Sequence, residues 1–107
     1  MEERDISEIE AAVWKEIATV EDPDLGLALT DLGLIYEVKI DQDNMAHIKM
    51  TLTSMGCPAA PQLTAGVHAA ATRVEGIQDA QVEVVWTPTW NPREMASEEA
   101  QMVLGLY

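Results

Sequence analysis

Three segments of the chain alternate apolar and polar side chains with a period of two, and this pattern restricts the fold more than any other feature. The segments are 34–40, 45–53 and 81–86. A period of two is typical of β-strands with one buried and one solvent-facing side. Helices should therefore cover a single face of the sheet, since a sheet covered on both faces would carry apolar residues on both. The predicted apolar face contains Tyr36, Val38, Ile48, Met50, Val82 and Val84.

Apolar residues at helical spacing predict two main helices. The first spans about residues 6–20. The second begins between Pro58 and Pro61, because proline lacks an N–H and is tolerated in the first turn, where the amides have no partner in the helix. It extends to about Val74, and Gly76 is its predicted left-handed cap.

The segment 86–93 alternates proline with tryptophan and predicts a stiff, extended stretch whose two tryptophans, Trp86 and Trp90, cap the core. The alternative is that one of them lies beside Cys57. Helix-start signals further on predict a final helix. The fold class is therefore α+β. We expect a two-layer α/β structure of order α-β-β-α-β-α, with a three-stranded sheet and helices mainly on one face, in a single domain spanning residues 1–107.

Cys57 is the single cysteine of the sequence and stands between Gly56 and Pro58, where the strand pattern ends and the helical pattern begins. Amides at a helix start favour the thiolate, which is the form that binds metal or acts as a nucleophile. A structural role is the alternative, because cysteine is often a small buried hydrophobic residue.

The charge is strongly negative, with 19 acidic residues against 6 basic ones and a net charge of −13. Such a surface repels phosphate backbones, so nucleic acid is excluded as an expected partner. We expect neither a signal peptide nor a membrane span, because the sequence shows no signal-peptide pattern and no apolar run long enough to span a bilayer. A single cysteine also rules out an intrachain disulfide framework, so we expect a cytoplasmic protein.

The tetrapeptide Asp-Leu-Gly-Leu occurs at 24–27 and again at 31–34, which predicts two glycine-containing turns. Two interpretations of the acidic residues in this region remain open. Asp22, Asp24 and Asp31 either serve the turns, which is the commoner role, or converge as oxygen ligands for a hard cation.

Short motifs are distributed along almost the whole chain, from about Glu8 to the end. They are Asp22-Pro23-Asp24, residues 30–36, Thr51-Leu52-Thr53, Gly56-Cys57-Pro58, residues 86–90, Met95-Ala96-Ser97 and Leu104-Gly105. In this order and spacing they resemble the MIP18-like family, once called domain of unknown function 59. Its members include SufT, PaaD and MIP18.

The resemblance implies a fold similar to the C-terminal domain of NifU-type scaffolds and a role in assembling or delivering iron–sulfur clusters. Cys57 matches the family's reactive cysteine, which makes it the implied contact to metal or cluster, and Asp31 and Thr53 match polar positions near it. The sequence departs from the family pattern at Met55, where proline is usual, and at Asp24, where glutamate is common. The C-terminal cysteine cluster of PaaD-type proteins is missing, which favours the stand-alone, SufT-like branch.

The leading functional hypothesis is a non-catalytic accessory factor that works with the iron–sulfur assembly machinery and with recipient apo-proteins. A cluster normally takes four thiolates and this chain offers one, so no tightly bound cluster is expected. Contact is either transient or shared between two copies in a homodimer. Three alternatives stay open. They are a PaaD-like accessory protein of phenylacetate degradation, an interaction module with a structural Cys57, and an enzyme with a Cys57 nucleophile and His47 or His68 as base.

Overall fold

The structure is a computed structural model that describes residues 6–23, 26–53 and 59–105. Its elements are α1 (Ile6–Ile17), α2 (Leu29–Leu32), β1 (Ile35–Ile40), β2 (Met45–Met50), α3 (Ala60–Thr72), β3 (Asp79–Val84), α4 (Pro92–Met95) and α5 (Glu98–Leu104). The predicted order of the main elements is confirmed, and the short helix α2 was not predicted. No helix in the described part of the chain combines the length and the apolar character needed to cross a membrane.

The three strands form one sheet in the order β1-β2-β3. Strands β1 and β2 are antiparallel and joined by a polar turn, in which Asp41 Oδ1 accepts hydrogen bonds from the amides of Asp43 (2.8 Å) and Met45 (3.0 Å). Asn44 adopts a left-handed conformation there (φ 61°), which asparagine tolerates well. Strand β3 is parallel to β2, so the chain crosses over between them through α3.

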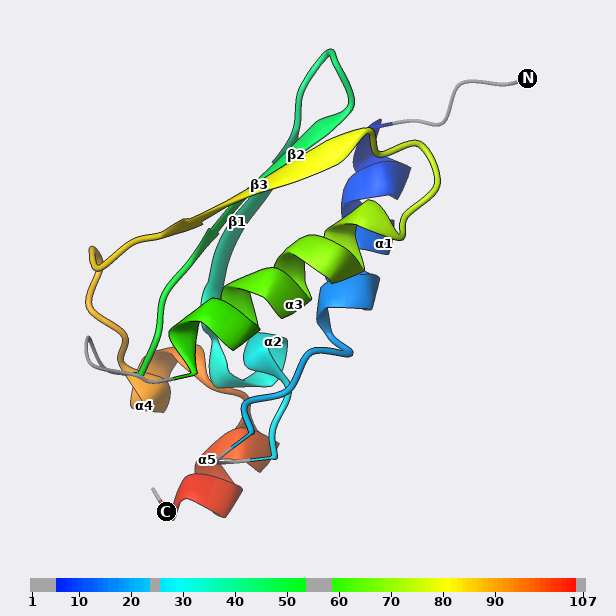
Figure 1. The fold of residues 1–107 in the computed structure, drawn as a ribbon. Coiled ribbons are helices and arrows are strands. Elements are labelled where there is room, and N and C mark those ends of the chain that lie inside the picture. Colours follow the sequence, from blue (N-terminus) through cyan, green and yellow to red (C-terminus); the bar gives the residue numbers. More distant parts are fainter. Residues whose placement is uncertain (1–5, 24–25, 54–58, 106–107) are drawn as a thin grey trace.

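Helices α1 and α3 both lie on one face of the sheet, as Figure 1 shows. The side chains of Val38, Ile48 and Met50 are buried on that face. The other face is open and polar, and its charged side chains pair within the sheet, with Glu37 lying 3.5 Å from Lys39 and 3.8 Å from Lys49. The predicted two-layer arrangement is confirmed.

Tyr36, predicted to lie on the apolar face of the sheet, is not buried in the core. The pairing steps from Ile35↔Met50 to Glu37↔Lys49, so two residues of β1 oppose one of β2. A β-bulge of this kind interrupts the alternation of side chains. Ile35 is buried as a result, while Tyr36 is only partly buried and its hydroxyl donates to the carbonyl of Pro88 (2.9 Å).

The start of α3 agrees with the prediction, whereas the C-terminal ends of α3 and α1 differ from it. Helix α3 begins at Ala60 with proline in its first turn, within the predicted interval. Its C-cap is Arg73 in a right-handed conformation, so the prediction that Gly76 caps the helix is wrong. Gly76 is left-handed (φ 99°) but lies in the turn that follows. Helix α1 ends at Ile17, three residues before the predicted end.

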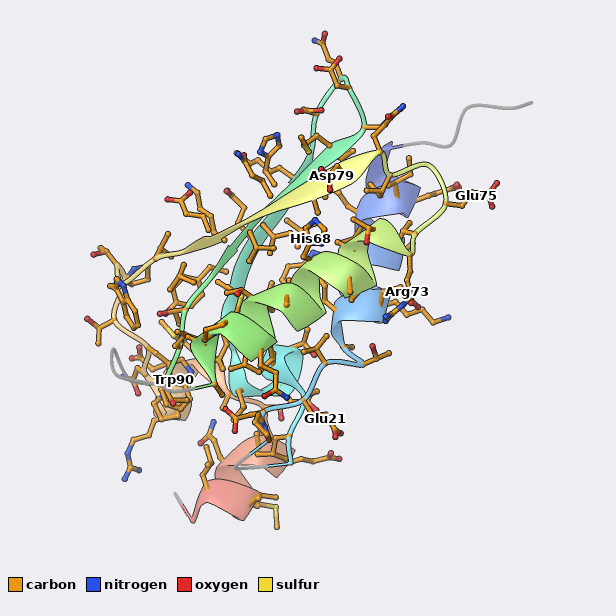
Figure 2. The ribbon with its side chains drawn as sticks, in the orientation of Figure 1. Glu21, His68, Arg73, Glu75, Asp79 and Trp90 are labelled. Carbon is orange, nitrogen blue, oxygen red and sulfur yellow. The ribbon has the colours of Figure 1, made fainter. Side chains whose placement is uncertain are left out.

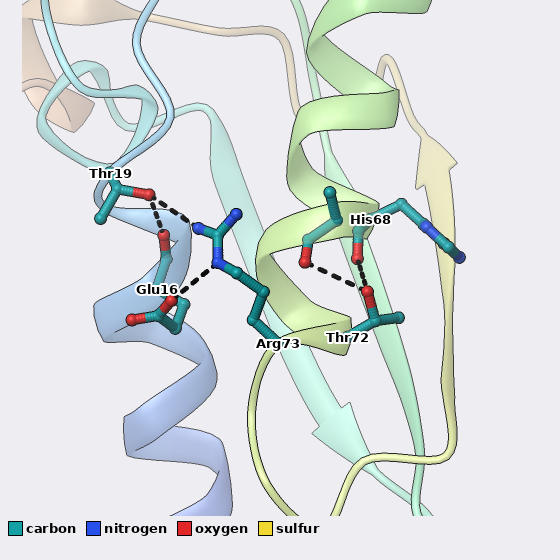
Figure 3. Close-up of polar contacts among 6 residues, drawn as sticks. Glu16, Thr19, His68, Thr72 and Arg73 are labelled. Carbon is teal, nitrogen blue, oxygen red and sulfur yellow. Dashed lines mark hydrogen bonds and ion pairs between the residues drawn. The ribbon is translucent and has the colours of Figure 1, made fainter.

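A polar cross-link joins the ends of α1 and α3 on the surface (Figure 3). Arg73 Nε donates to Glu16 Oε1 at 3.0 Å, and a second guanidinium nitrogen donates to Thr19 Oγ1 at 3.2 Å. Thr19 Oγ1 in turn donates to the Glu16 carbonyl at 2.7 Å. Beneath this cross-link the two helices pack through buried aliphatic residues. These are Ile9, Val13 and Ile17 of α1 with Leu63, Val67, Ala70 and Ala71 of α3.

The C-terminal segment contains two short helices where one was predicted. They are separated at Ala96–Ser97, and the Ser97 hydroxyl caps α5 by accepting from the Ala100 amide (3.2 Å). Trp90 packs against the core as predicted. Trp86 is 38% exposed, so the prediction that it also caps the core is wrong.

Candidate functional site

Asp31 and Thr53, two of the three predicted site residues, lie at the same end of the sheet. The Thr51 amide donates to the Leu34 carbonyl at 2.8 Å, which joins the entry into β1 to the exit from β2. Asp31 precedes that junction by three residues and Thr53 follows it by two, and both are exposed. Within the described residues no hydrogen bond joins their side chains, so the structure brings them to one end of the sheet without placing them in contact.

Cys57, the third predicted site residue, lies outside the described residues, as does Asp24. The nearest described residues are Thr53 before it and Ala59 after it. Ala59 is the N-cap of α3 and provides no side-chain hydrogen bond to the free amides of the first turn. The predicted grouping of Cys57 with Asp31 and Thr53 therefore stays a prediction.

The glycines of the two Asp-Leu-Gly segments adopt turn conformations, as predicted, while Asp24 and Leu25 lie outside the described residues. Gly26 and Gly33 are both left-handed, with φ of 67° and 77°. Asp22 is buried (4% exposed) and its carbonyl accepts from the Gly26 amide at 2.8 Å. Asp31 by contrast is exposed on α2. Among the described residues no three His, Cys, Asp or Glu side chains gather closely enough to hold a metal ion. Asp24, one of the three predicted cation ligands, lies outside those residues, so the choice between the two interpretations stays open.

The C-terminal segment supports the Asp31 turn, a relationship that the sequence patterns did not predict. The indole Nε1 of Trp90 donates to the carbonyl of Leu32 at 2.7 Å, and the Ser97 amide donates to the carbonyl of Asp31, also at 2.7 Å. Figure 2 shows Trp90 beside α4. In the sequence, both the Asp31 turn and the C-terminal segment contain motifs of the family resemblance. That shared membership does not indicate that the two segments contact each other.

The side chains of Tyr36 and Thr51 form a hydrogen bond at this end of the sheet. Thr51 is buried, and Tyr36 Oη lies 3.6 Å from Met95 Sδ. Burial raises the pKa of Tyr36 above its usual range, and a hydrogen bond with the Thr51 side chain opposes part of that rise. Tyr36 is therefore a neutral hydrogen-bond donor at physiological pH.

Both histidines pair with aspartates on the surface, away from Asp31. His47 Nε2 lies 2.7 Å from Asp41 Oδ2, and His68 Nε2 lies 3.0 Å from Asp79 Oδ1, where α3 meets β3 (Figure 2). The His47 hydrogen bond, followed by the Met45 amide, lowers the pKa of Asp41. The Ala80 amide, followed by His68, lowers the pKa of Asp79. Both pairings are surface contacts between partly exposed side chains.

A shallow hollow of about 400 Å³ lies on the open face of the sheet between β2 and β3. Its lining residues are His47, Ile48, Lys49, Gln81, Val82 and Glu83. Neither Asp31 nor Thr53 lines it, whereas His47, a candidate base of the enzyme alternative, does. The hollow is therefore separate from Asp31 and Thr53.

The family model, the relatives and the solved structure that resemble this chain all point to the same family. A family model described as iron–sulfur cluster assembly protein matches residues 10–84. The chain is 44% identical over 87 residues to the Fe-S protein maturation auxiliary factor YitW of Bacillus subtilis, covering 81% of this chain and 84% of that protein. It is 41% identical over 85 residues to the Fe-S protein maturation auxiliary factor SufT of Staphylococcus aureus, covering 79% and 96%. A crystal structure of a domain of unknown function, DUF59, from Bacillus anthracis superposes with a TM-score of 0.84 and 37% identity, covering 94% and 95% of the two chains.

Proposed function

The chain belongs to the iron–sulfur cluster assembly protein family, and from that premise we propose that it is an accessory factor in the assembly of iron–sulfur clusters or their delivery to recipient proteins. The observation that carries the proposal is the similarity to two maturation auxiliary factors, one of which is matched over 96% of its length. The family match contains Asp31, Thr53 and Cys57. The partners are the assembly machinery and apo-proteins that lack their cluster.

Cys57 contacts the cluster, which is cargo and not a resident cofactor. One thiolate supplies one of the four ligands that a cluster normally takes, so retention by this chain alone is weak. Delivery is an exchange of ligands. Each bond between iron and the Cys57 sulfur that breaks is replaced by a bond to a recipient thiolate, and the iron, the sulfide and the electrons of the cluster are conserved.

Asp31 and Thr53 assist at the same site. Both side chains are exposed at the end of the sheet where β2 leads toward Cys57 in the sequence. The Asp31 carboxylate supplies a hard oxygen ligand to iron or accepts a proton from the thiol. The Thr53 hydroxyl donates a hydrogen bond to a sulfur or oxygen atom. These roles need no covalent catalysis, so we infer a handling factor and not an enzyme.

Anaerobic transfer to a recipient tests the proposal. The chain is mixed with ferric iron, sulfide and an apo-ferredoxin of the [2Fe–2S] type, and the visible absorbance of the ferredoxin cluster is followed. The wild-type chain should accelerate its appearance, while Cys57→Ser and Cys57→Ala should not, although both should unfold at wild-type denaturant concentrations.

The two substitutions separate thiolate chemistry from packing. A packing role for Cys57 is compatible with alanine, because alanine keeps the site apolar and small. Full activity of Cys57→Ala would therefore refute a cluster contact and favour an interaction module. Absence of any acceleration by the wild-type chain would refute cluster delivery to this recipient class.

A further inference from the structure

The last two carbonyls of α2 receive their hydrogen bonds from the C-terminal segment. Helix α2 has four residues, and its cap amide at Gly33 bonds only to the carbonyls of Leu29 and Thr30. The end of a helix leaves its final carbonyls without partners in the helix. Here the Ser97 amide donates a hydrogen bond to the Asp31 carbonyl, and the Trp90 indole N–H donates one to the Leu32 carbonyl, each at 2.7 Å.

Two further contacts hold the same segments together. The Met95 backbone packs so closely on Gly33 that a Cβ atom there would overlap it. Met95 Sδ lies 3.6 Å from the Tyr36 hydroxyl and 3.3 Å from the Asn91 amide. The backbone around Asp31 is therefore fixed from the C-terminal side, although the Asp31 residue itself is exposed to solvent.

These contacts come from outside the part of the chain that the family model matches. That match ends at residue 84, whereas Trp90 and Ser97 lie beyond it. The bond from Trp90 spans 58 residues of sequence. The segment that carries Asp31 thus depends for its geometry on residues beyond the matched range, which lie in two further motifs of the family resemblance, residues 86–90 and Met95-Ala96-Ser97.

We propose that Trp90 is a positioning residue for the cluster-handling site, acting by holding the α2 turn so that the Asp31 carboxylate faces solvent at the end of the sheet. This inference rests on the proposed function. Orienting groups behind a metal-binding side chain typically change affinity or activity by about 10- to 100-fold when removed. Trp90→Phe removes the N–H donor and keeps most of the ring, so it isolates the hydrogen bond from the packing.

The test uses the ferredoxin transfer assay with five full-length proteins. They are the wild type, Trp90→Phe, Asp31→Asn, the double variant and Trp14→Phe. Trp14 is the matched control, since it is also partly buried against the core but lies on α1. We expect Trp90→Phe and Asp31→Asn each to slow transfer about tenfold, and the double variant to slow it no further, because both changes act through one carboxylate.

The outcomes separate positioning from stability. Trp14→Phe should keep the wild-type transfer rate even where it lowers the denaturation midpoint as much as Trp90→Phe does. A wild-type rate in Trp90→Phe would overturn the inference, and so would losses that multiply in the double variant.

Measurements made without any cluster test the positioning role of Trp90 separately from the proposed function. Amide hydrogen exchange at Ser97 and the carboxyl carbon NMR signal of Asp31 report the turn directly. In Trp90→Phe we expect faster exchange at Ser97 and a shifted Asp31 signal, both absent in Trp14→Phe. If the wild-type chain fails to accelerate transfer, the proposed function fails, and unchanged signals in Trp90→Phe would then overturn the positioning role as well.

Discussion

The backbone carbonyl of Met95 fills the space that a Cβ atom on Gly33 would occupy. Gly33 also has a φ of 77°, which side chains other than glycine rarely adopt. Gly33→Ala should therefore combine backbone strain with overpacking and destabilise the fold by about 2–4 kcal/mol. Urea denaturation followed by circular dichroism measures the loss.

Gly26→Ala is the matched control for this substitution. Gly26 has a similar φ of 67°, but nothing lies within 4 Å of an added Cβ atom. It should therefore show only the backbone strain, about 1 kcal/mol. Equal losses in the two variants would contradict the close packing of the C-terminal segment on Gly33.

Tyr36 should make stability sensitive to alkaline pH. Burial raises the pKa of Tyr36 in the folded state, against the partial opposing effect of Thr51. The folded state therefore holds this proton more tightly than the unfolded state does. The resulting stability is fully present below about pH 10 and is lost as the pH rises through the folded-state pKa. Tyr36→Phe should flatten this alkaline decline, measured as the urea midpoint between about pH 9 and 11.5.

A spectroscopic titration checks the same assignment. The chain has two tyrosines, so the ultraviolet change on ionisation should show two steps in the wild type. Tyr36→Phe should remove the later one. Loss of the earlier step would show that Tyr36 ionises as readily as an unburied tyrosine.

The sheet and its covered face were predictable from the sequence because each depends on a local repeat. Val38, Ile48 and Met50 alternate with polar residues, and a period of two places them on one face whatever surrounds them. The bulge at Tyr36 was not predictable from that repeat. Its position coincides with a hydroxyl contact to Pro88, a residue 52 positions away.

The site was predictable only in part, for a related reason. The residue types and the motif order predict Cys57, Asp31 and Thr53 as candidate site residues, and the antiparallel hairpin brings the last two to one end of the sheet. The bond from Trp90 to Leu32 has no signature in either local pattern, since an indole N–H can donate to any exposed carbonyl. Contacts of this kind depend on how the finished elements pack.

Asp41 should contribute to stability on the acid side. Its pKa is lowered first by the His47 side chain and then by backbone amides, of which that of Met45 is the strongest. A lowered folded-state pKa means that the contribution is present above about pH 4 and is lost as the pH falls through the folded value. Asp41→Asn cannot ionise, so the fall of the urea midpoint below about pH 4 should be shallower than in the wild type.

Asp43→Asn controls for the change in net charge. It removes one carboxylate from the same turn but leaves the pair of Asp41 and His47 in place. Its acid profile should follow that of the wild type more closely than the Asp41→Asn profile does. Identical profiles in both variants would assign the effect to net charge and not to the pair.

Ligand number and charge together predict how a reconstituted cluster is held. If Cys57 is the only thiolate, a [2Fe–2S] unit should bridge two copies, with small thiols or carboxylates completing the ligands. Each copy carries a net charge of −13, so repulsion opposes the pairing and salt should strengthen it. Sedimentation of the reconstituted protein should show more dimer at about 500 mM than at about 50 mM salt, where screening lengths are several-fold apart. Cys57→Ala should stay monomeric and colourless at both. A wild-type monomer that holds a full cluster, or a coloured alanine variant, would contradict the prediction.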